Sequence, residues 1–142
     1  MSSIDNANMY GAITRAEMAK MLSVYAKEVL GKELNTSAAC TFNDIDSVKG
    51  DLHQYIIESC QLGIMGQGLT AFRPYDTISR AEFGTALSRV LWEGKYEGGT
   101  PYYANHLNAL KAAGIMNQIA NAESTKEIRG YVMLMLMRSE EG

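Results

Sequence analysis

The sequence lacks the features by which several classes of protein are recognised. No apolar run approaches the roughly 20 residues that a membrane-spanning helix needs. The net charge is −3 and no basic run is present, so the chain has no electrostatic sign of a nucleic-acid-binding protein. The first residues carry neither the basic nor the apolar segment of a signal peptide, which fits either a cytosolic protein or a fragment of a longer secreted one. We therefore expect no membrane span and no nucleic-acid partner.

Cysteine and histidine are too few and too scattered for a transition-metal centre. The chain has two cysteines, Cys40 and Cys60, and two histidines, His53 and His106, and these do not share a ligand-like spacing. Cys60 falls in an apolar helical pattern, so it is either a small buried hydrophobic residue or the partner of Cys40 in a disulfide. The spacing does not decide between these two. We expect no metal and no cofactor.

The sequence also lacks the common catalytic motifs. It has no G-x-S-x-G elbow, no P-loop and no dinucleotide-binding fingerprint. An EF-hand loop starting at Asp44 would place Lys49 at the required glycine and Tyr55 at the bidentate glutamate, so a calcium site is rejected. A helix cap by Asp44 or Asp46 is the better interpretation. We expect a protein that is not an enzyme.

What the sequence does have is an internal repeat. The stretch ITRAEM at 13–18 returns as ISRAEF at 78–83, and apolar residues at helical spacing follow both. A third, diverged copy, EIRGYVMLMLMRS, places Arg129 at the position of Arg80. A helix that ends in Gly-Ile-Met precedes each of the last two copies. The unit is therefore helix, Gly-Ile-Met, loop and helix.

These units predict one mostly α-helical domain. Because a single helix pair cannot cover both of its faces, the repeats should pack together around shared central helices. Residues 1–10 are too short and polar to supply the helix that would open the first unit, so we expect another segment or subunit to cover the face it leaves. Within the single domain 1–142, the predicted parts are the closing half of the first repeat at 1–35, the second repeat at 36–93 and the divergent third at 94–142.

The two clear copies fit the capping box of a helix start. Thr14 and Ser79 are the predicted N-caps, and Glu17 and Glu82 are predicted to reach back to the amide of the cap residue. The two glutamates resemble the paired carboxylates of a glycosidase, but capping accounts for them without catalysis.

Capping does not explain the arginine of the motif. A cation in the first turn faces the positive end of the helix dipole, which is mildly unfavourable. Beside free backbone N–H groups, Arg15 and Arg80 would form a receptor for a carboxylate or phosphate. The alternatives are an internal ion pair and a solvated surface arginine. In the third copy the best capping box, STKE at 124–127, would start the helix early and leave Arg129 beyond its first turn.

Two further apolar features bear on the core. The run VMLMLM at 132–137 is apolar on all sides, so we expect a central buried helix, with an adaptable contact surface as the alternative. Trp92 is the single tryptophan and closes the predicted second central helix. We interpret it as core or rim packing, with a platform for a sugar ring as the alternative.

The order of motifs in the second repeat resembles that of the S-layer homology (SLH) family. FND at 42–44, a helix, GIMGQG, AFRP, ISRAEF and a closing helix match the family pattern of F-x-D, helix, G-I, glycine-rich turn, F-x-P and I-T-R-A-E-F. The match covers the second repeat, the closing helix of the first and a divergent third. The resemblance implies a mostly α, pseudo-threefold helical repeat bundle, with ordered loops and with central helices that start at the TRAE and SRAE motifs.

The resemblance also implies a function. SLH repeats anchor surface proteins to cell-wall polysaccharide, often a pyruvylated secondary polymer, so the chain would be a non-catalytic anchoring module at the cell surface, secreted as part of a longer protein. It would bind an anionic polysaccharide in grooves between repeats. The alternative is a protein-protein assembly module that joins subunits of a surface or appendage complex through the same scaffold. The implied ligand-binding residues are the arginines and glutamates of the motif, the glycine turn and an aromatic at the start of a helix: Arg15, Arg80, Arg129, Glu17, Glu82, Gly66, Gly68 and Tyr102.

Overall fold

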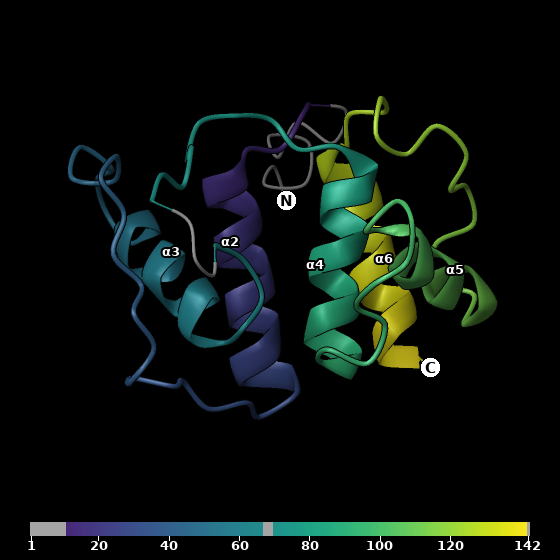
Figure 1. Cartoon of the computed structure of the whole chain (residues 1–142), viewed down its shortest axis with the longest axis horizontal. Coiled ribbons are helices and arrows are strands. Elements are labelled where there is room, and N and C mark those ends of the chain that lie inside the picture. Colours follow the sequence, from purple (N-terminus) through teal and green to yellow (C-terminus); the bar gives the residue numbers. More distant parts are fainter. Residues whose placement is uncertain (1–10, 67–69, 142) are drawn as a thin grey trace, which may run out of the picture. The chain divides into compact units, whose positions relative to one another are not determined.

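The computed structural model describes residues 11–66 and 70–141, and these are mostly helical, which confirms the predicted mostly-α class (Figure 1). The described part contains no β-strand, and extended pairing there is limited to the bridges Ala12–Ile128 and Ser79–Lys126. Within it, no helix has the length and apolar character to cross a membrane. The helices are α2 (Arg15–Val24), the π-helix η1 (Tyr25–Val29), α3 (Leu52–Gln61), α4 (Arg80–Trp92), α5 (Ala104–Ala112) and α6 (Arg129–Glu141).

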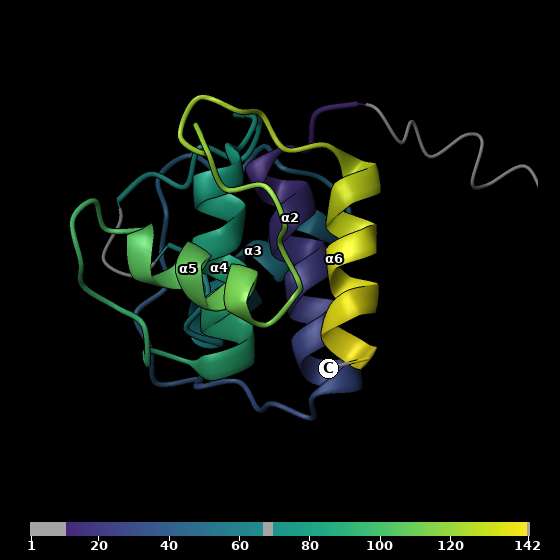
Figure 2. The ribbon, with the colours of Figure 1, turned by 90° about the vertical axis from the view of Figure 1, so that its right-hand side faces the viewer.

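The chain divides into two compact units. One is Thr14–Asp76, which we call the α2–α3 unit, and the other holds residues 11–13 and 77–141, which we call the α4–α6 unit. In the first, α3 packs on α2; in the second, α5 packs on α4, as Figure 2 shows. The helix that opens a predicted repeat therefore lies on the closing helix of the repeat before it. For this reason the boundary between the units falls inside the predicted second repeat, 36–93.

Both predicted capping boxes are present. The Thr14 hydroxyl accepts a hydrogen bond from the Glu17 amide at 3.2 Å, and the Glu17 carboxylate accepts one from the Thr14 amide at 3.0 Å. Ser79 and Glu82 make the same exchange at 3.1 and 2.9 Å. Each box satisfies backbone donors that a helix start leaves without an intrahelical partner. Helices α2 and α4 consequently each begin at the arginine of their motif.

The helix of the third copy does not begin where the STKE box predicts. Helix α6 starts at Arg129, the position that corresponds to the first residue of α2 and of α4. The hydroxyls of Ser124 and Thr125 donate back to the Asn121 carbonyl at 3.1 and 2.9 Å, and the Glu127 side chain is engaged in an ion pair. Because these polar side chains are occupied elsewhere, the predicted box does not form. The expectation that Arg129 lies beyond the first turn is wrong.

A closed ring of backbone hydrogen bonds joins the three copies of the motif. The Ile13 amide donates to the Glu127 carbonyl at 3.3 Å, the Ile78 amide to the Ile13 carbonyl at 3.1 Å, and the Glu127 amide to the Ile78 carbonyl at 3.0 Å. Each of these residues stands two places before the arginine that begins a helix. All three are buried, so the third copy places a carboxylate where the other two place an apolar side chain.

Helix α4 carries a notch for α5 at Gly84. A Cβ atom on this glycine would lie 2.1 Å from Leu107 Cδ2 and 3.4 Å from Leu110 Cδ1, both of which belong to α5. The missing side chain thus lets two leucines approach the α4 backbone. Around the notch α4 is deeply buried, with Phe83 and Leu87 fully inaccessible to solvent.

Helix α6 is buried on one side only. Val132 and Met135 are 0% and 4% exposed, whereas Met133, Leu134 and Met137 are 39%, 37% and 61% exposed. The expectation that the methionine-rich run forms a helix buried all round is therefore wrong. The second side of α6 is therefore accessible to solvent at these three residues.

In the α2–α3 unit, Asp44 fixes a loop instead of capping a helix. Its carboxylate accepts hydrogen bonds from the amides of Phe72 at 2.9 Å and Arg73 at 2.8 Å, while α3 begins only at Leu52. The predicted helix cap by Asp44 or Asp46 is thus wrong. Burial acts to raise the pKa of Asp44, but the backbone hydrogen bonds and the charge of Arg15 together outweigh it and hold the pKa below its ordinary value.

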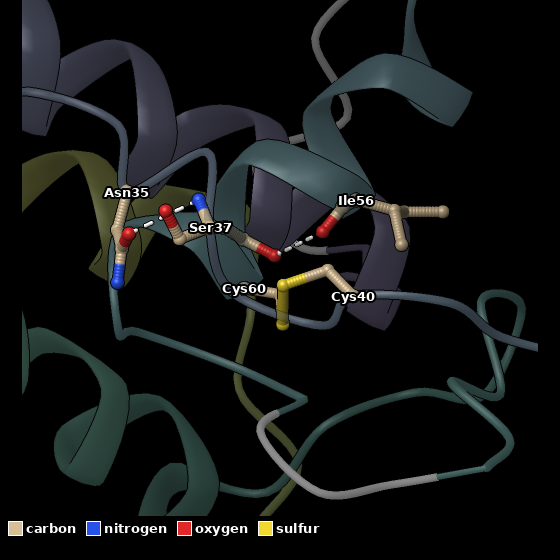
Figure 3. The surroundings of a disulfide bond; sticks show 6 residues. Asn35, Ser37, Cys40, Ile56 and Cys60 are labelled. Atoms are coloured by element: carbon tan, nitrogen blue, oxygen red, sulfur yellow. Dashed lines mark hydrogen bonds between the residues drawn. A yellow bond between two sulfur atoms is a disulfide. The ribbon is translucent and has the colours of Figure 1, made fainter.

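Cys40 and Cys60 form a disulfide that ties the segment before α3 to the end of that helix (Figure 3). Their Cα atoms are 5.8 Å apart. Close by, the Asn35 side chain accepts a hydrogen bond from the Ser37 amide at 3.1 Å and stabilises the turn that leads to Cys40. Of the two alternatives that the sequence left open for these cysteines, the structure shows the disulfide.

Candidate ligand-binding site

The arginines that begin α2 and α4 are buried instead of projecting into solvent. Arg15 and Arg80 are 7% and 8% exposed, so neither is a solvated surface residue. The Nε–H of Arg15 donates to the Phe72 carbonyl at 2.7 Å, and its guanidinium carbon lies 5.0 Å from the centre of the Phe72 ring. Arg15 thus holds the same residue whose amide binds Asp44.

Arg80 forms an internal ion pair, one of the alternatives that the sequence left open. Its Nε and Nη2 donate to the two carboxylate oxygens of Glu127 at 3.2 Å each, and its Nη1 donates to the Gln118 carbonyl at 3.3 Å. Its guanidinium carbon lies 4.9 Å from the centre of the Tyr131 ring. The Glu127 side chain is fully buried, and a forked partner offsets the cost of burying its charge.

The helix starts do not offer free backbone amides to an anion. The amides of Arg80 and Ala81 donate to the carbonyls of Thr125 at 2.8 Å and Ala122 at 3.0 Å. The first two amides of α2 are occupied by loop carbonyls in the same way. The expectation that free N–H groups at these two helix starts assist anion binding is therefore wrong.

A hollow of about 180 Å³ opens beside Arg80. Its walls come from α4, α6 and the segment that follows α5. It is smaller than the roughly 300 Å³ at the lower end of pockets for drug-sized molecules, so it suits one sugar ring or one side chain. Among its lining residues are Arg80, Asn117, Gln118, Tyr131, Leu134 and Arg138.

Arg138 gives this hollow a cation that no described carboxylate neutralises. Its Nη1 donates to the Ile115 carbonyl at 3.2 Å, and it makes no ion pair with the described side chains. Tyr131, which lines the same hollow, is 45% exposed. A guanidinium, a phenol ring and two side-chain amides can together bind a ring that carries a carboxylate.

Sequence reasoning missed Arg138, although one signal was available. Counted from the arginine that begins each helix, Arg138 holds the same place in α6 as Arg89 holds in α4. The alignment of Arg129 with Arg80 in the third copy already implies this correspondence.

Of the predicted site residues that the structure describes, only Arg80 lines the hollow. The carboxylates of Glu17 and Glu82 hold helix starts. Arg129 begins α6, and its amide donates to the Gly11 carbonyl at 3.2 Å. The structure therefore gives the two glutamates capping roles and places the third arginine at a helix start like the first two.

The other predicted site residues have packing roles or lie outside the described chain. Gly66, in the α2–α3 unit, has a positive φ of 82°, and a Cβ there would lie 2.9 Å from Phe42 Cζ. Both the positive φ and the lack of room for a Cβ atom therefore require glycine at this position. Tyr102 is 55% exposed and packs edge-on against Tyr103 ahead of α5. Gly68 lies outside the described residues.

A second polar cluster joins α4 to the segment that leads into α5. The buried His106 has Nδ1 2.7 Å from the Ser88 hydroxyl and Nε2 3.3 Å from the Glu97 carboxylate, to which Arg89 Nε donates at 2.7 Å. Hydrogen bonding from Arg89 is the main cause that holds the pKa of Glu97 below its ordinary value. Ser88 is itself fully buried, so no substrate reaches its hydroxyl. The cluster fastens the segment 93–100 to α4.

The described residues contain no group of three or more His, Cys, Asp or Glu side chains placed to hold a metal ion. In comparisons with known proteins, no family model and no curated protein matches the chain. A function must therefore be inferred from the motifs and the geometry of the chain itself.

Proposed function

We propose that the chain is a non-catalytic module of the cell envelope that binds an anionic cell-wall polysaccharide, such as a pyruvylated one. The hollow beside Arg80 carries the proposal, because it sets Arg138 next to Tyr131 and two amide side chains. A pyruvate ketal places a carboxylate on a sugar ring. One unit of such a polymer therefore presents the two groups, a ring and an acid, that this hollow is suited to bind.

Three observations support the proposal. The Cys40–Cys60 disulfide fits an oxidising, extracellular compartment. The motifs of the second repeat resemble those of SLH modules. The hydrogen-bond ring through Ile13, Ile78 and Glu127 links equivalent points of three copies, as a pseudo-threefold bundle would.

In the proposed complex, Arg138 donates to the carboxylate of the sugar. Arg80 forms the wall of the hollow, because its charge is already balanced by Glu127. Contacts of the polysaccharide with Arg15 and Arg129 stay predictions that follow from the resemblance.

Binding to purified cell-wall polysaccharide tests this function. We expect the wild-type chain to bind, and Arg138→Ala to weaken binding about tenfold, because a charge-assisted hydrogen bond is lost. Arg73→Ala is the matched control, since it removes an equal charge from an exposed site in the α2–α3 unit. Polysaccharide freed of its ketal groups should bind the wild type as weakly as the intact polymer binds Arg138→Ala. Absence of wild-type binding, or an equal loss in Arg73→Ala, would contradict the proposal.

Assembly with another protein is the second candidate function. The observation that favours it is the exposed apolar side of α6, formed by Met133, Leu134 and Met137. Large exposed apolar patches commonly mark interaction sites.

A further inference from the structure

The exposed side of α6 has a counterpart on α4 that is covered. Counted from the arginine that begins each helix, Met133 and Met137 correspond to Gly84 and Ser88. Helix α5 covers both of these positions on α4, because one of its leucines enters the notch at Gly84 and His106 lies 2.7 Å from the Ser88 hydroxyl.

Helix α2 shows the same arrangement. Ala19 and Ser23 occupy the corresponding positions and are fully buried, and the Ser23 hydroxyl donates to the Tyr55 carbonyl of α3 at 3.5 Å. In two of the three copies, this side of the closing helix is therefore covered by a helix that ends in Gly-Ile-Met. On α6 the same positions hold Met133 and Met137, which are 39% and 61% exposed.

Each covering segment also brings a carboxylate to a basic residue of the helix that it covers. Lys20 of α2 pairs with Asp51 at the start of α3, at 2.8 Å, and Arg89 of α4 pairs with Glu97 ahead of α5, at 2.7 Å. Arg138 holds the place of Arg89 in α6, and within the described part of the chain no carboxylate pairs with it. The exposed side of α6 thus lacks both an apolar cover and an acidic neighbour.

We propose that this side of α6, with Met133, Leu134 and Met137 at its centre and Arg138 at its rim, binds an amphipathic helix of another polypeptide. The partner helix resembles α5: it has an apolar stripe and, upstream, a carboxylate that meets Arg138. Met133 carries a Cβ atom where Gly84 leaves a notch. The partner helix therefore lies farther from the α6 backbone than α5 lies from that of α4, and the flexible methionine side chains fill the added distance. The inference deepens the second candidate function and does not depend on polysaccharide binding.

A synthetic peptide with the sequence of residues 94–117 is the probe, because it contains Glu97, α5 and the following Gly-Ile-Met. We expect it to bind the full chain and to slow amide hydrogen exchange at residues 131–140. Met133→Asp should weaken binding by about tenfold or more, since docking would bury a charge. Leu30→Asp is the matched control, because Leu30 has the same 39% exposure but lies in the α2–α3 unit. It should leave binding unchanged.

The charge pair is tested by altering the peptide, which avoids any effect on folding of the chain. A peptide with Glu97→Gln should bind the wild-type chain about two- to fivefold more weakly, as expected for a partly exposed ion pair. On Arg138→Ala the two peptides should bind equally, because the partner of the carboxylate is gone.

Three results would overturn the inference. The first is no protection of α6 at about 1 mM peptide, the weak limit of useful affinity. The second is an equal loss of binding in Leu30→Asp. The third is a dimer of the chain that Met133→Asp dissociates, which would make a second copy the occupant. Tyr131→Ala should reduce polysaccharide binding and spare the peptide, whereas Met133→Asp should do the reverse, so each proposal can fail separately.

Discussion

The Glu127 carboxylate lies 3.2 Å from both Nε and Nη2 of Arg80, at a position where the other two copies of the motif carry Ile13 and Ile78. The third position of the hydrogen-bond ring is therefore acidic where the other two are apolar. The guanidinium of Arg80 donates both of these hydrogen bonds to the acid. The fork of Arg80 is therefore used within the protein, whereas Arg138, which lines the same hollow, has no carboxylate partner among the described residues.

Loss of Glu127 alone should be strongly destabilising. We expect Glu127→Ala to lower the free energy of unfolding by about 3–5 kcal/mol, because Arg80 would stay buried without its partner. Urea denaturation at neutral pH measures the change. The double variant Arg80→Met with Glu127→Ile restores an apolar ring position, and it should unfold within about 1 kcal/mol of the wild type or be more stable. A double variant as unstable as Glu127→Ala would show that the ion pair is not the cause.

The notch at Gly84 should tolerate no side chain. Alanine improves helix propensity by about 1 kcal/mol, but its Cβ would meet Leu107 Cδ2 at 2.1 Å. We expect overpacking to prevail and Gly84→Ala to reduce stability by about 1–3 kcal/mol. Gly94→Ala is the control, since the nearest atom to its Cβ would be 3.6 Å away. Adding Leu107→Ala to Gly84→Ala should cost less than the sum of the two single changes, because the clash is removed.

Asp44 should contribute stability that disappears in acid. Its pKa is held below the ordinary value of 3.8 in the folded protein, so it binds a proton less readily when folded than when unfolded. Its contribution is therefore complete above the unfolded pKa and is lost as the pH falls through the lower, folded value. We expect Asp44→Asn to be less stable than the wild type at pH 7, by about 1–2 kcal/mol, with the gap closing toward pH 3. Denaturation curves across this range measure it, and the exposed Asp46→Asn should show no such gap.

The disulfide should stabilise the α2–α3 unit. Cys40 and Cys60 are separated by 20 residues, a loop length for which loss of the crosslink costs about 3 kcal/mol. Thermal unfolding with and without reductant measures this effect, and a Cys40→Ser, Cys60→Ser variant should match the reduced protein. Detection of free thiols in the unreduced, denatured chain would contradict the pairing.

The parts of the fold that could be predicted from sequence are those decided by near neighbours in the chain. The capping boxes of Thr14 with Glu17 and of Ser79 with Glu82 depend on residues three apart, and both form. The mostly helical class follows from apolar spacing, which is also local. These features need no knowledge of what packs against the helix.

The misses concern residues whose partners are distant in the sequence. Glu127 has the spacing of a capping glutamate from Ser124, but a buried arginine 47 residues away binds it instead. In the sequence, only the alignment of EIRG at 127–130 with ISRA at 78–81 places Glu127 at the position of Ile78 in the hydrogen-bond ring. Cys40 and Cys60 could not be paired from spacing, because only the fold brings their Cα atoms within 5.8 Å. The candidate hollow was missed for the same reason, since three separate segments form it.

The hydrogen-bond ring through Ile13, Ile78 and Glu127 also determines when this part of the fold can be completed during synthesis of the chain. Ile13 and Ile78 leave the ribosome well before Glu127, yet Ile13 donates to the Glu127 carbonyl and Ile78 accepts from its amide. Neither of these bonds can form until the third motif has been synthesised. During translation the first two motifs therefore hold an incomplete ring, and its closure is a late step that couples opposite ends of the chain.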